Sequence, residues 1–447
     1  MEHYQIAIIG GGPAGYTAAE KAGRAGMSVV LFEKKSLGGV CLNEGCIPTK
    51  TLLYSAKIYD NARASSKYGV STSDVSFDLS KIVSRKQKVV RKLVLGVKSR
   101  LAAQGVKVVT GEAVIKAANR IVCGDETYAC DNLIVCTGSK TFIPSVKGIE
   151  DISYWTHKDA LDNKVLPASL VVVGGGVIGM EFASFFNSLG VKVTVIEMMN
   201  EILGGIDSEI AGLLRVDYAK RGVKFLTGTK VVRFDREESN IEVHYENADG
   251  EGFVSGEKVL MSVGRRPQTE GYGLENLGLE LTERGRIKLD SHLETSVKGV
   301  YVCGDLNGVS LLAHTAVREA EVAVAHILGI EDEMSYKAIP GVVYTNPEVA
   351  SVGMTEDMIK MSGKEYNVVK LPMAFSGRFV AENEGVNGLI KAISDNEGRL
   401  LGVHIYGNPA SELIVLAGIM IEDGRSIDDL KQYVFPHPSV SEIYKEL

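Results

Sequence analysis

The sequence lacks several features that would place it in a special class of proteins. No apolar run approaches the roughly 18 to 20 residues that a membrane-spanning helix needs. Basic residues are outnumbered by acidic ones, 49 against 56, which gives a formal net charge of −7. A chain of this charge is not expected to bind nucleic acid. We therefore expect a cytoplasmic protein that binds neither nucleic acid nor membranes.

Cysteine is also scarce, with 6 residues in 447, which argues against the disulfide scaffold of a small secreted protein. Four of the six stand singly in apolar, strand-like runs and are expected to be buried core residues: Cys123, Cys130, Cys136 and Cys303. The other two, Cys41 and Cys46, are five residues apart, and no further Cys or His pair has a spacing suitable for zinc. The sequence therefore predicts no metal site.

Proline is scarce and glycine abundant, 11 against 49 residues, which predicts tight turns and close backbone contacts. Two segments repeat the same order of elements: an apolar strand, a glycine-rich turn, a helix, and a second strand closed by a glutamate. The first copy contains Gly10, Gly12, Gly15 and Glu33. The second contains Gly174, Gly176, Gly179 and Glu197, all at one offset from their counterparts.

Each copy predicts a dinucleotide site. The first glycine permits the turn, the second lets the backbone approach a pyrophosphate, and the third lets the helix pack closely. The helix N-terminus faces the phosphates, and the glutamate accepts hydrogen bonds from a ribose. Two such units in one chain suggest one flavin and one nicotinamide. No Lys or Arg follows Glu197 before Arg215, so we expect NAD rather than NADP.

Other parts of the chain are less specific. Residues 78–104 form a helical stretch rich in Lys and Arg, which we interpret as a solvated helix face. From about Tyr336, short strand-like runs surround one apolar helical segment at residues 413–421, which indicates a separate α+β domain. The predicted fold class is α/β: two Rossmann-like dinucleotide-binding domains followed by a C-terminal α+β domain.

The segment around Cys41 and Cys46 is open to two interpretations. In an ideal helix the two cysteines would be too far apart for a disulfide, whose Cα atoms are about 4.4 to 6.8 Å apart, but Gly45 could relax the chain. Pro48 fits the first turn of a following helix, whose positive end would lower a thiol pKa near Cys46. The pair is either two buried thiols or a redox-active disulfide. The dinucleotide sites favour the second, because a flavin needs a redox partner besides the nicotinamide.

Over its whole length, the chain resembles the pyridine nucleotide-disulfide oxidoreductases. The most specific similarity is the cysteine motif GGVCLNEGCIPTK at residues 38–50, followed by HPSVSE at residues 437–442. Further similarities are Thr137-Gly138-Ser139, Cys303-Gly304-Asp305, residues 311–314 and residues 264–267. The resemblance implies an enzyme that holds FAD and NAD.

It also implies roles for individual residues. Cys41 would exchange with the substrate thiol, Cys46 would face the flavin, and Lys50 would pair with Glu181 beside it. The implied FAD-binding residues are Gly10, Gly12, Gly15, Glu33, Lys50, Ala113, Thr137, Gly138, Ser139, Asp305, Leu311, Leu312, Ala313 and His314. The implied NAD-binding residues are Gly174, Gly176, Val177, Ile178, Gly179, Glu181, Glu197, Val231 and Gly264.

The resemblance further implies a homodimer with shared active sites. His437, oriented by Glu442, would be the general base for the cysteines of the partner subunit. The expected domains are residues 1–140 (FAD-binding, first part), 141–268 (NAD-binding), 269–335 (FAD-binding and central, second part) and 336–447 (interface, or dimerisation).

Among members of the family, the chain resembles those that oxidise protein-bound dihydrolipoamide to lipoamide with NAD. Its partners would be the lipoylated carrier domains of 2-oxoacid dehydrogenase or acetoin complexes, or the carrier protein of glycine cleavage. One alternative is an NAD(P)H-dependent reductase of another low-molecular-weight disulfide, although such enzymes usually carry arginines after the second fingerprint. A second is a protein that binds flavin and NAD without turnover, which the intact catalytic groups disfavour.

Overall fold

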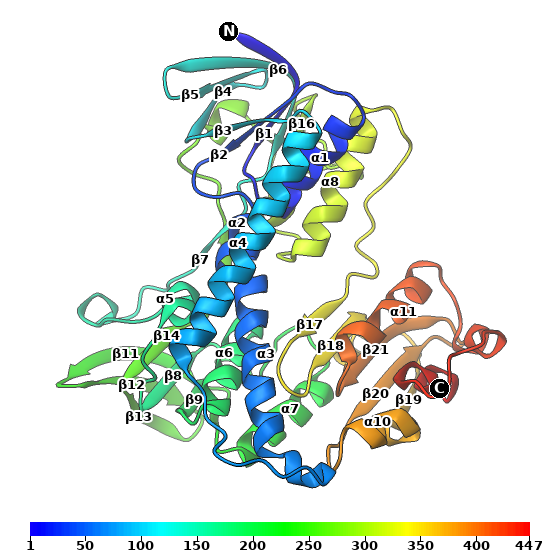
Figure 1. Cartoon of the computed structure of the whole chain (residues 1–447). Coiled ribbons are helices and arrows are strands. Elements are labelled where there is room, and N and C mark those ends of the chain that lie inside the picture. Colours follow the sequence, from blue (N-terminus) through cyan, green and yellow to red (C-terminus); the bar gives the residue numbers. More distant parts are fainter. The chain divides into compact units, whose positions relative to one another are not determined.

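The computed structural model describes every residue from Met1 to Leu447 (Figure 1). The chain divides into two compact units. The first comprises Met1–Thr51, Ser84–Phe142 and Gly264–Ser335, and the second comprises Leu52–Val83, Ile143–Val263 and Tyr336–Leu447. The grouping of Leu52–Val83 with the second unit was not expected from the sequence.

A seven-stranded sheet forms the centre of the first unit, in the order β3-β2-β1-β6-β5-β4 with β16 also paired to β6. Strands β3, β2, β1, β6 and β16 run parallel, while β4 and β5 extend the sheet in antiparallel fashion. The strands are β1 Glu2–Ile9, β2 Val29–Glu33, β3 Lys107–Thr110, β4 Ala113–Ala117, β5 Arg120–Cys123, β6 Glu126–Val135 and β16 Val300–Val302.

Both faces of this sheet are covered, as expected for parallel strands. Side chains alternate along β1, so that Ile6 and Ile8 pack in one apolar cluster and Ala7 and Ile9 in another. The first cluster also takes in residues of α1 Pro13–Arg24, α4 Leu79–Ala103 and α8 Ala313–Ile327. The four scattered cysteines are 8%, 3%, 7% and 0% exposed for Cys123, Cys130, Cys136 and Cys303, which confirms them as core residues.

The first part of the second unit repeats the parallel arrangement. Its four-stranded sheet has the order β10-β9-β8-β14, with β8 Ser169–Val173, β9 Lys192–Ile196, β10 Lys224–Leu226 and β14 Lys258–Met261. Helices α5 His157–Asp162, α6 Val177–Ser188 and α7 Ser208–Lys220 accompany it. A three-stranded antiparallel sheet follows, with β11 Lys230–Glu237, β12 Asn240–Asn247 and β13 Gly250–Gly256. Its residues Phe234, Ile241 and Val243 belong to the same apolar cluster as Val171 and Val259.

The C-terminal part of the second unit is built on a five-stranded antiparallel sheet, ordered β17-β18-β21-β20-β19. The strands are β17 Gly341–Val343, β18 Val349–Gly353, β19 Asn367–Pro372, β20 Leu389–Ser394 and β21 Leu400–Tyr406, and the helices are α9 Glu356–Ser362, α10 Gly377–Glu382 and α11 Ala410–Glu422. The predicted α/β class with a C-terminal α+β domain is confirmed. None of the helices combines the length and apolar character needed to cross a bilayer.

Candidate active site

The first glycine-rich turn links β1 to α1. Gly10 has a φ of +102°, which favours glycine. A Cβ atom on Gly15 would lie 1.8 Å from the carbonyl oxygen of Gly10, so only glycine lets α1 pack this closely. At Gly12 the nearest atom to such a Cβ would be 3.8 Å away. The middle glycine is therefore in no more than ordinary van der Waals contact, with the Cα atom of Gly39, at the start of α1, where a pyrophosphate is expected.

The second turn, between β8 and α6, has the same geometry. Gly174 has a φ of +103°, and a Cβ atom on Gly179 would lie 2.0 Å from the carbonyl oxygen of Gly174. Nothing lies within 4 Å of the position of a Cβ on Gly176. Val177 and Ile178 open α6 directly after it. Both turns thus have the shape that a dinucleotide requires.

The two glutamates are held in the same way. The carboxylate of Glu33 accepts hydrogen bonds from the backbone N–H of Gly11 at 2.8 Å and of Lys35 at 2.7 Å. The carboxylate of Glu197 accepts them from the N–H of Gly175 at 2.7 Å and of Met199 at 2.8 Å. Each carboxylate is therefore fixed beside its glycine turn. This is the position from which it can bind ribose hydroxyls and repel a 2′-phosphate.

The cysteine motif folds into two helices separated at Gly45. Helix α2 Gly39–Glu44 contains Cys41, and α3 Cys46–Arg63 begins at the second cysteine. Gly45 has a φ of −140° and a ψ of −108°, so the backbone is not helical there. The expected relaxation of the chain at Gly45 is confirmed, and Pro48 lies in the first turn of α3, as predicted.

The two sulfurs lie together as a dithiol pair. The hydrogen bond with Cys46 and burial raise the pKa of the Cys41 thiol far above its usual value, while the positive charge of Lys50 acts in the opposite direction. This hydrogen bond and burial therefore favour the protonated form of Cys41. Such a pair can be oxidised to a disulfide and reduced again to two thiols.

Asp305 lies in a polar network of the first unit. It follows β16 within the short 3₁₀ helix Gly304–Asn307 and accepts a short hydrogen bond from the Ser139 hydroxyl. Arg265 donates to the Oγ of Ser139 at 2.7 Å and to its carbonyl oxygen at 2.8 Å. These bonds join the strand pair β7 Ser139–Thr141 and β15 Arg265–Pro267 to Asp305.

Glu319 is a structural contributor that sequence reasoning missed. It lies on α8, is 0% exposed, and accepts hydrogen bonds from the backbone N–H of Gly304 at 2.5 Å and the amide of Asn307 at 2.8 Å. It thereby fixes the helical turn that carries Asp305. Its position in the sequence of α8 offered no local signal of this contact.

The other predicted flavin residues also lie in the first unit. The Thr137 hydroxyl donates to the carbonyl oxygen of Gln268 at 3.0 Å, and Gly138 has a φ of +73°. Ala113 begins β4, while Leu311 and Leu312 precede α8, which Ala313 and His314 open. Among the residues expected at the nicotinamide, Val231 lies on β11 of the second unit, and Gly264 begins the last segment of the first unit.

Glu181 is on α6 in the second unit, whereas Lys50 is in the first. Its side chain is buried, with 3% of the residue exposed, and accepts a hydrogen bond from the backbone N–H of Tyr344 at 3.0 Å. The pairing of Glu181 with Lys50 stays a prediction.

His437 and Glu442 form a pair near the C-terminus. The Nδ1 of His437 lies 2.8 Å from the carboxylate of Glu442, which also accepts from the backbone N–H of Ser439 at 2.9 Å. The hydrogen bond from the Ser439 N–H, and to a smaller extent that with His437, lowers the pKa of Glu442 below its usual value. The side chain of His437 is 82% exposed. The imidazole is therefore oriented by a carboxylate through its Nδ1 atom and is largely exposed to solvent.

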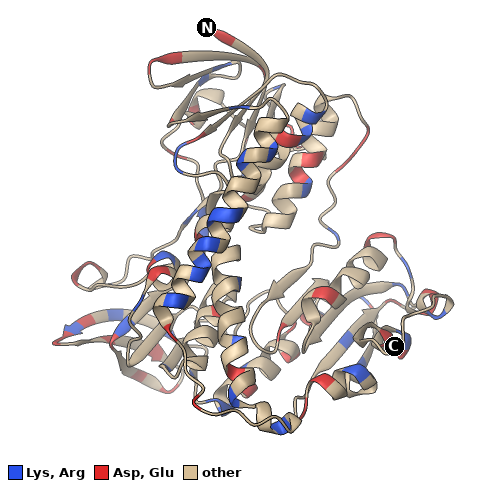
Figure 2. Cartoon of the chain, viewed as in Figure 1, with Lys and Arg blue, Asp and Glu red and all other residues tan.

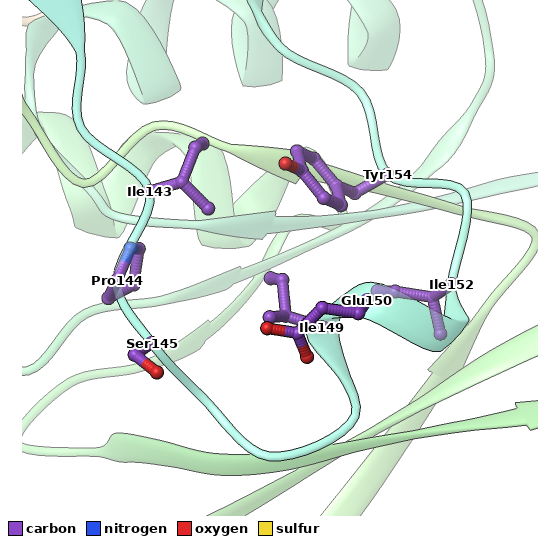
Figure 3. A pocket seen from close by; sticks show the side chains of 7 residues that line it. All are labelled: Ile143, Pro144, Ser145, Ile149, Glu150, Ile152 and Tyr154. Atoms are coloured by element: carbon purple, nitrogen blue, oxygen red, sulfur yellow. The ribbon is translucent and has the colours of Figure 1, made fainter.

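A separate cavity of about 430 Å³ lies in the second unit (Figure 3). It is lined by Ile143, Pro144, Ser145, Ile149, Glu150, Ile152 and Tyr154. None of the predicted site residues is among them, so we assign it no part in the candidate active site.

Comparisons with known proteins agree with this geometry. Residues 4–320 match the family described as pyridine nucleotide-disulphide oxidoreductase, and residues 339–447 match the dimerisation domain of the same family. The dihydrolipoyl dehydrogenase of Thermus scotoductus is 39% identical, covering 99% of this chain and 96% of the relative. That of Mycoplasma pneumoniae is 38% identical, covering 100% and 98%.

Solved structures show the same fold over the full length. The HOCl-induced flavoprotein disulfide reductase RclA from Escherichia coli has a TM-score of 0.87 and 30% identity, covering 99% of each chain. LpdA from Mycobacterium tuberculosis has a TM-score of 0.89 and 27% identity, covering 100% of this chain and 98% of its own.

Proposed function

The chain belongs to the pyridine nucleotide-disulphide oxidoreductase family, and we propose that it oxidises protein-bound dihydrolipoamide to lipoamide with NAD as electron acceptor. The predicted family, fold class and flavin- and nicotinamide-dependent oxidoreductase chemistry are confirmed. The observation that carries the proposed activity is the Cys41/Cys46 dithiol pair in a chain 39% identical to a dihydrolipoyl dehydrogenase.

The two dinucleotide turns would hold the cofactors, FAD at the turn of Gly12 in the first unit and NAD at the turn of Gly176 in the second. Bound FAD supplies an acceptor for the electron pair of the dithiol, and NAD carries that pair away as NADH. Asp305, which accepts a hydrogen bond from Ser139 and lies in the turn held by Glu319, would bind a hydroxylated part of the flavin. Glu197, held by two backbone N–H groups, would bind the NAD ribose.

The chemistry of the chain's own residues begins from the Cys41–Cys46 disulfide. His437 takes a proton from one substrate thiol, and the thiolate attacks the sulfur of Cys41. The disulfide bond breaks, a mixed disulfide forms, and Cys46 leaves as a thiolate. The second substrate thiol loses its proton to Cys41 as it attacks the other sulfur of the mixed disulfide. Lipoamide is released, and the Cys41 thiol and Cys46 thiolate together hold the substrate's electron pair.

The dimerisation domain supports a homodimer. In this dimer, His437 and Glu442 of one subunit would serve Cys41 and Cys46 of the other. The exposure of His437 is consistent with this, because a general base at 82% side-chain exposure is accessible to another chain. The proposed domain order follows: FAD-binding residues 1–140 and 269–335, NAD-binding residues 141–268, and interface residues 336–447. A cytoplasmic location belongs to the same proposal, because six cysteines in 447 residues are too few for the disulfide scaffold of a secreted protein.

A reductase of another low-molecular-weight disulfide is not favoured. The full-length relatives are named dihydrolipoyl dehydrogenases. Glu197 is followed by Met198 and Met199, and Met199 donates only its backbone N–H to the glutamate. No cation adjacent to Glu197 in sequence would therefore neutralise the extra phosphate of NADP. The lipoylated carriers of 2-oxoacid dehydrogenase, acetoin or glycine-cleavage systems are the proposed protein partners.

The proposal is tested by assaying the purified chain with dihydrolipoamide and NAD, and separately with oxidised glutathione and NADPH. We expect flavin absorbance in the protein as isolated, and turnover only with the first pair of substrates. Cys46→Ser should abolish that turnover and Cys123→Ser, which changes a cysteine of the core, should preserve it. Preferential turnover of glutathione with NADPH would establish the alternative activity instead.

A further inference from the structure

We propose that the exposed basic face of α4 is the docking surface for an acidic carrier protein that presents the dithiol substrate. This inference rests on the proposed function, because it identifies how the partner that delivers dihydrolipoamide is recognised. We define the basic face by four cations in the part of α4 that belongs to the first unit: Lys88, Arg91, Lys92 and Lys98.

The charge of α4 opposes the charge of the whole chain. The chain has a formal net charge of −7, yet no Asp or Glu occurs in the sequence between Asp78 and Glu112. The basic residues of the helix are Lys81, Arg85, Lys86, Lys88, Arg91, Lys92, Lys98 and Arg100. Figure 2 shows Lys and Arg spread along this helix. An acidic molecule approaching the protein therefore meets a concentrated positive surface here.

The basic face points away from the protein core. Val94, Val97 and Leu101 pack α4 into the apolar cluster that also contains residues of α1 and α8. Lys88, Arg91, Lys92 and Leu95 stand at the spacing i, i+3, i+4 and i+7, so they share one face of the helix on the opposite side. All of them are exposed, and Leu95 is 58% exposed. From Lys88 to Lys98 the face extends about 15 Å along the helix axis.

These cations have no acidic partner within the chain. Toward the ends of the helix, Lys81 lies 3.6 Å from Asp78 and Arg100 lies 3.2 Å from Glu20. Lys88, Arg91, Lys92 and Lys98 form no such ion pair. Like charges at i, i+3 and i, i+4 destabilise a helix, so this arrangement opposes the stability of the isolated chain. An acidic partner would remove that repulsion.

The chemistry of the substrate points to a protein as this partner. Dihydrolipoamide is uncharged, because its carboxyl group is consumed in the amide bond to the carrier. A cationic surface therefore recognises the carrier rather than the reacting group. The net negative charge of the remaining chain repels an acidic carrier, so attraction at α4 would both speed the encounter and set its orientation. Exposed Leu95 adds one apolar contact among the charges.

A lipid surface is a poorer fit to the same helix. A helix that lies in a membrane interface buries its apolar face among the lipids. The apolar face of α4, with Val94, Val97 and Leu101, is already packed in the core of the first unit. Only Leu95 would be left for insertion from the basic face.

The test is charge reversal on the basic face, K88E/R91E/K92E, in the full-length protein with its cofactors. The matched control reverses three exposed cations of the first unit outside α4, K107E/R284E/K298E. Each variant is assayed with free dihydrolipoamide and with a reduced, purified lipoyl domain of acidic net charge, over a range of salt concentrations. We expect kcat/KM for the lipoyl domain to fall by at least about tenfold in the α4 variant and to lose most of its salt dependence.

The same variant should oxidise free dihydrolipoamide within about twofold of the unmodified protein, as should the control with both substrates. Equal kcat/KM of the α4 variant and the control for the lipoyl domain would overturn the docking surface. The docking surface would also be overturned if the α4 variant lost binding to phosphatidylserine vesicles while its kcat/KM for the lipoyl domain stayed unchanged. If the unmodified protein oxidised no dihydrolipoamide, the proposed function would fail. Calorimetric binding of the oxidised lipoyl domain to the variants would still decide the docking surface.

Discussion

Replacing Lys391 by methionine should destabilise the second unit strongly, because it leaves buried carboxylates without their cation. Lys391 is on β20, and its side chain is 2% exposed. Its ammonium lies 3.0 Å from both oxygens of Asp207, whose side chain is 0% exposed. It also lies 3.0 Å from Glu209 and 2.6 Å from Glu356. Asp207 and Glu209 begin α7 and Glu356 begins α9, so one lysine links the start of two helices to the C-terminal sheet.

The magnitude follows from the burial of Asp207. Removing one partner of a buried ion pair costs about 3 to 5 kcal/mol, because the other charge stays buried and uncompensated. Lys370→Met is the matched control, since Lys370 also binds Glu209, at 2.8 Å, but its side chain is 44% exposed. An exposed pair of this kind contributes less than about 1 kcal/mol. The two substitutions remove the same chemical group and differ in exposure.

The pH dependence gives a second measurement. Hydrogen bonds from Lys360 and Lys391 lower the pKa of Glu356 from 4.5 to about 2. The stability contributed by a carboxylate with a lowered pKa is present above the unfolded pKa, and it is lost as pH falls toward the folded value. The difference in stability between the wild-type chain and Lys391→Met should therefore be largest above pH 5 and shrink between about pH 4.5 and pH 2.

The assay is the urea midpoint of the first unfolding transition, because the chain has several domains. The variants are compared at one protein concentration, because the stability of the proposed homodimer depends on it. We expect a lower midpoint for Lys391→Met and a midpoint near that of the wild type for Lys370→Met. Equal midpoints for the two variants would refute the argument from burial. If the loss of stability in Lys391→Met stayed the same as pH falls, this would contradict the assignment of Glu356 to the carboxylates that Lys391 binds.

Three further predictions concern the active site. Cys46→Ser should retain FAD, seen in its absorbance, yet lose dihydrolipoamide oxidation; turnover at near wild-type rates would exclude the dithiol mechanism. His437→Gln should slow dihydrolipoamide oxidation by about 100- to 10,000-fold while NADH still reduces the flavin in stopped-flow spectra. An equal loss of both half-reactions would argue against a base that serves only the thiols. Glu197→Ala combined with Met198→Arg should raise the ratio of kcat/KM for NADP to that for NAD, and an unchanged ratio would count against Glu197 as the selector.

The dinucleotide turns could be predicted in detail because their constraints are local. The φ angles of Gly10 and Gly174, +102° and +103°, and the lack of room for a Cβ at Gly15 and Gly179 follow from a turn of fixed shape between a strand and a helix. A sequence pattern that repeats with constant spacing therefore specifies a repeated geometry. The interruption at Gly45 is equally local.

The buried contacts between distant segments could not be predicted. Lys391 stands in the strand sequence LIKAIS and is 184 residues from Asp207. A lysine is usually exposed, and only the fold brings it to three carboxylates. Glu319 is a similar case, because its partners Gly304 and Asn307 belong to a turn outside its own helix. Neither residue has a motif, since the requirement for a partner arises from burial and not from sequence neighbours.

The two copies of the fingerprint also separate two explanations of cofactor choice. Lys34 and Lys35 follow Glu33, whereas Met198 and Met199 follow Glu197. If cations next to the glutamate decided cofactor choice, Lys34 and Lys35 would make the first copy a site for a cofactor with a 2′-phosphate. The cofactor expected there, FAD, has no such phosphate. Lys34 instead lies 3.5 Å from Glu112, and Lys35 donates its backbone N–H to Glu33. Because both glutamates are held by two backbone N–H groups at 2.7 to 2.8 Å, we expect the fixed carboxylate to be the feature that selects an unphosphorylated ribose in both copies. Removing it should therefore matter more than adding a cation, so Glu197→Ala should change the NADP to NAD ratio more than Met198→Arg alone.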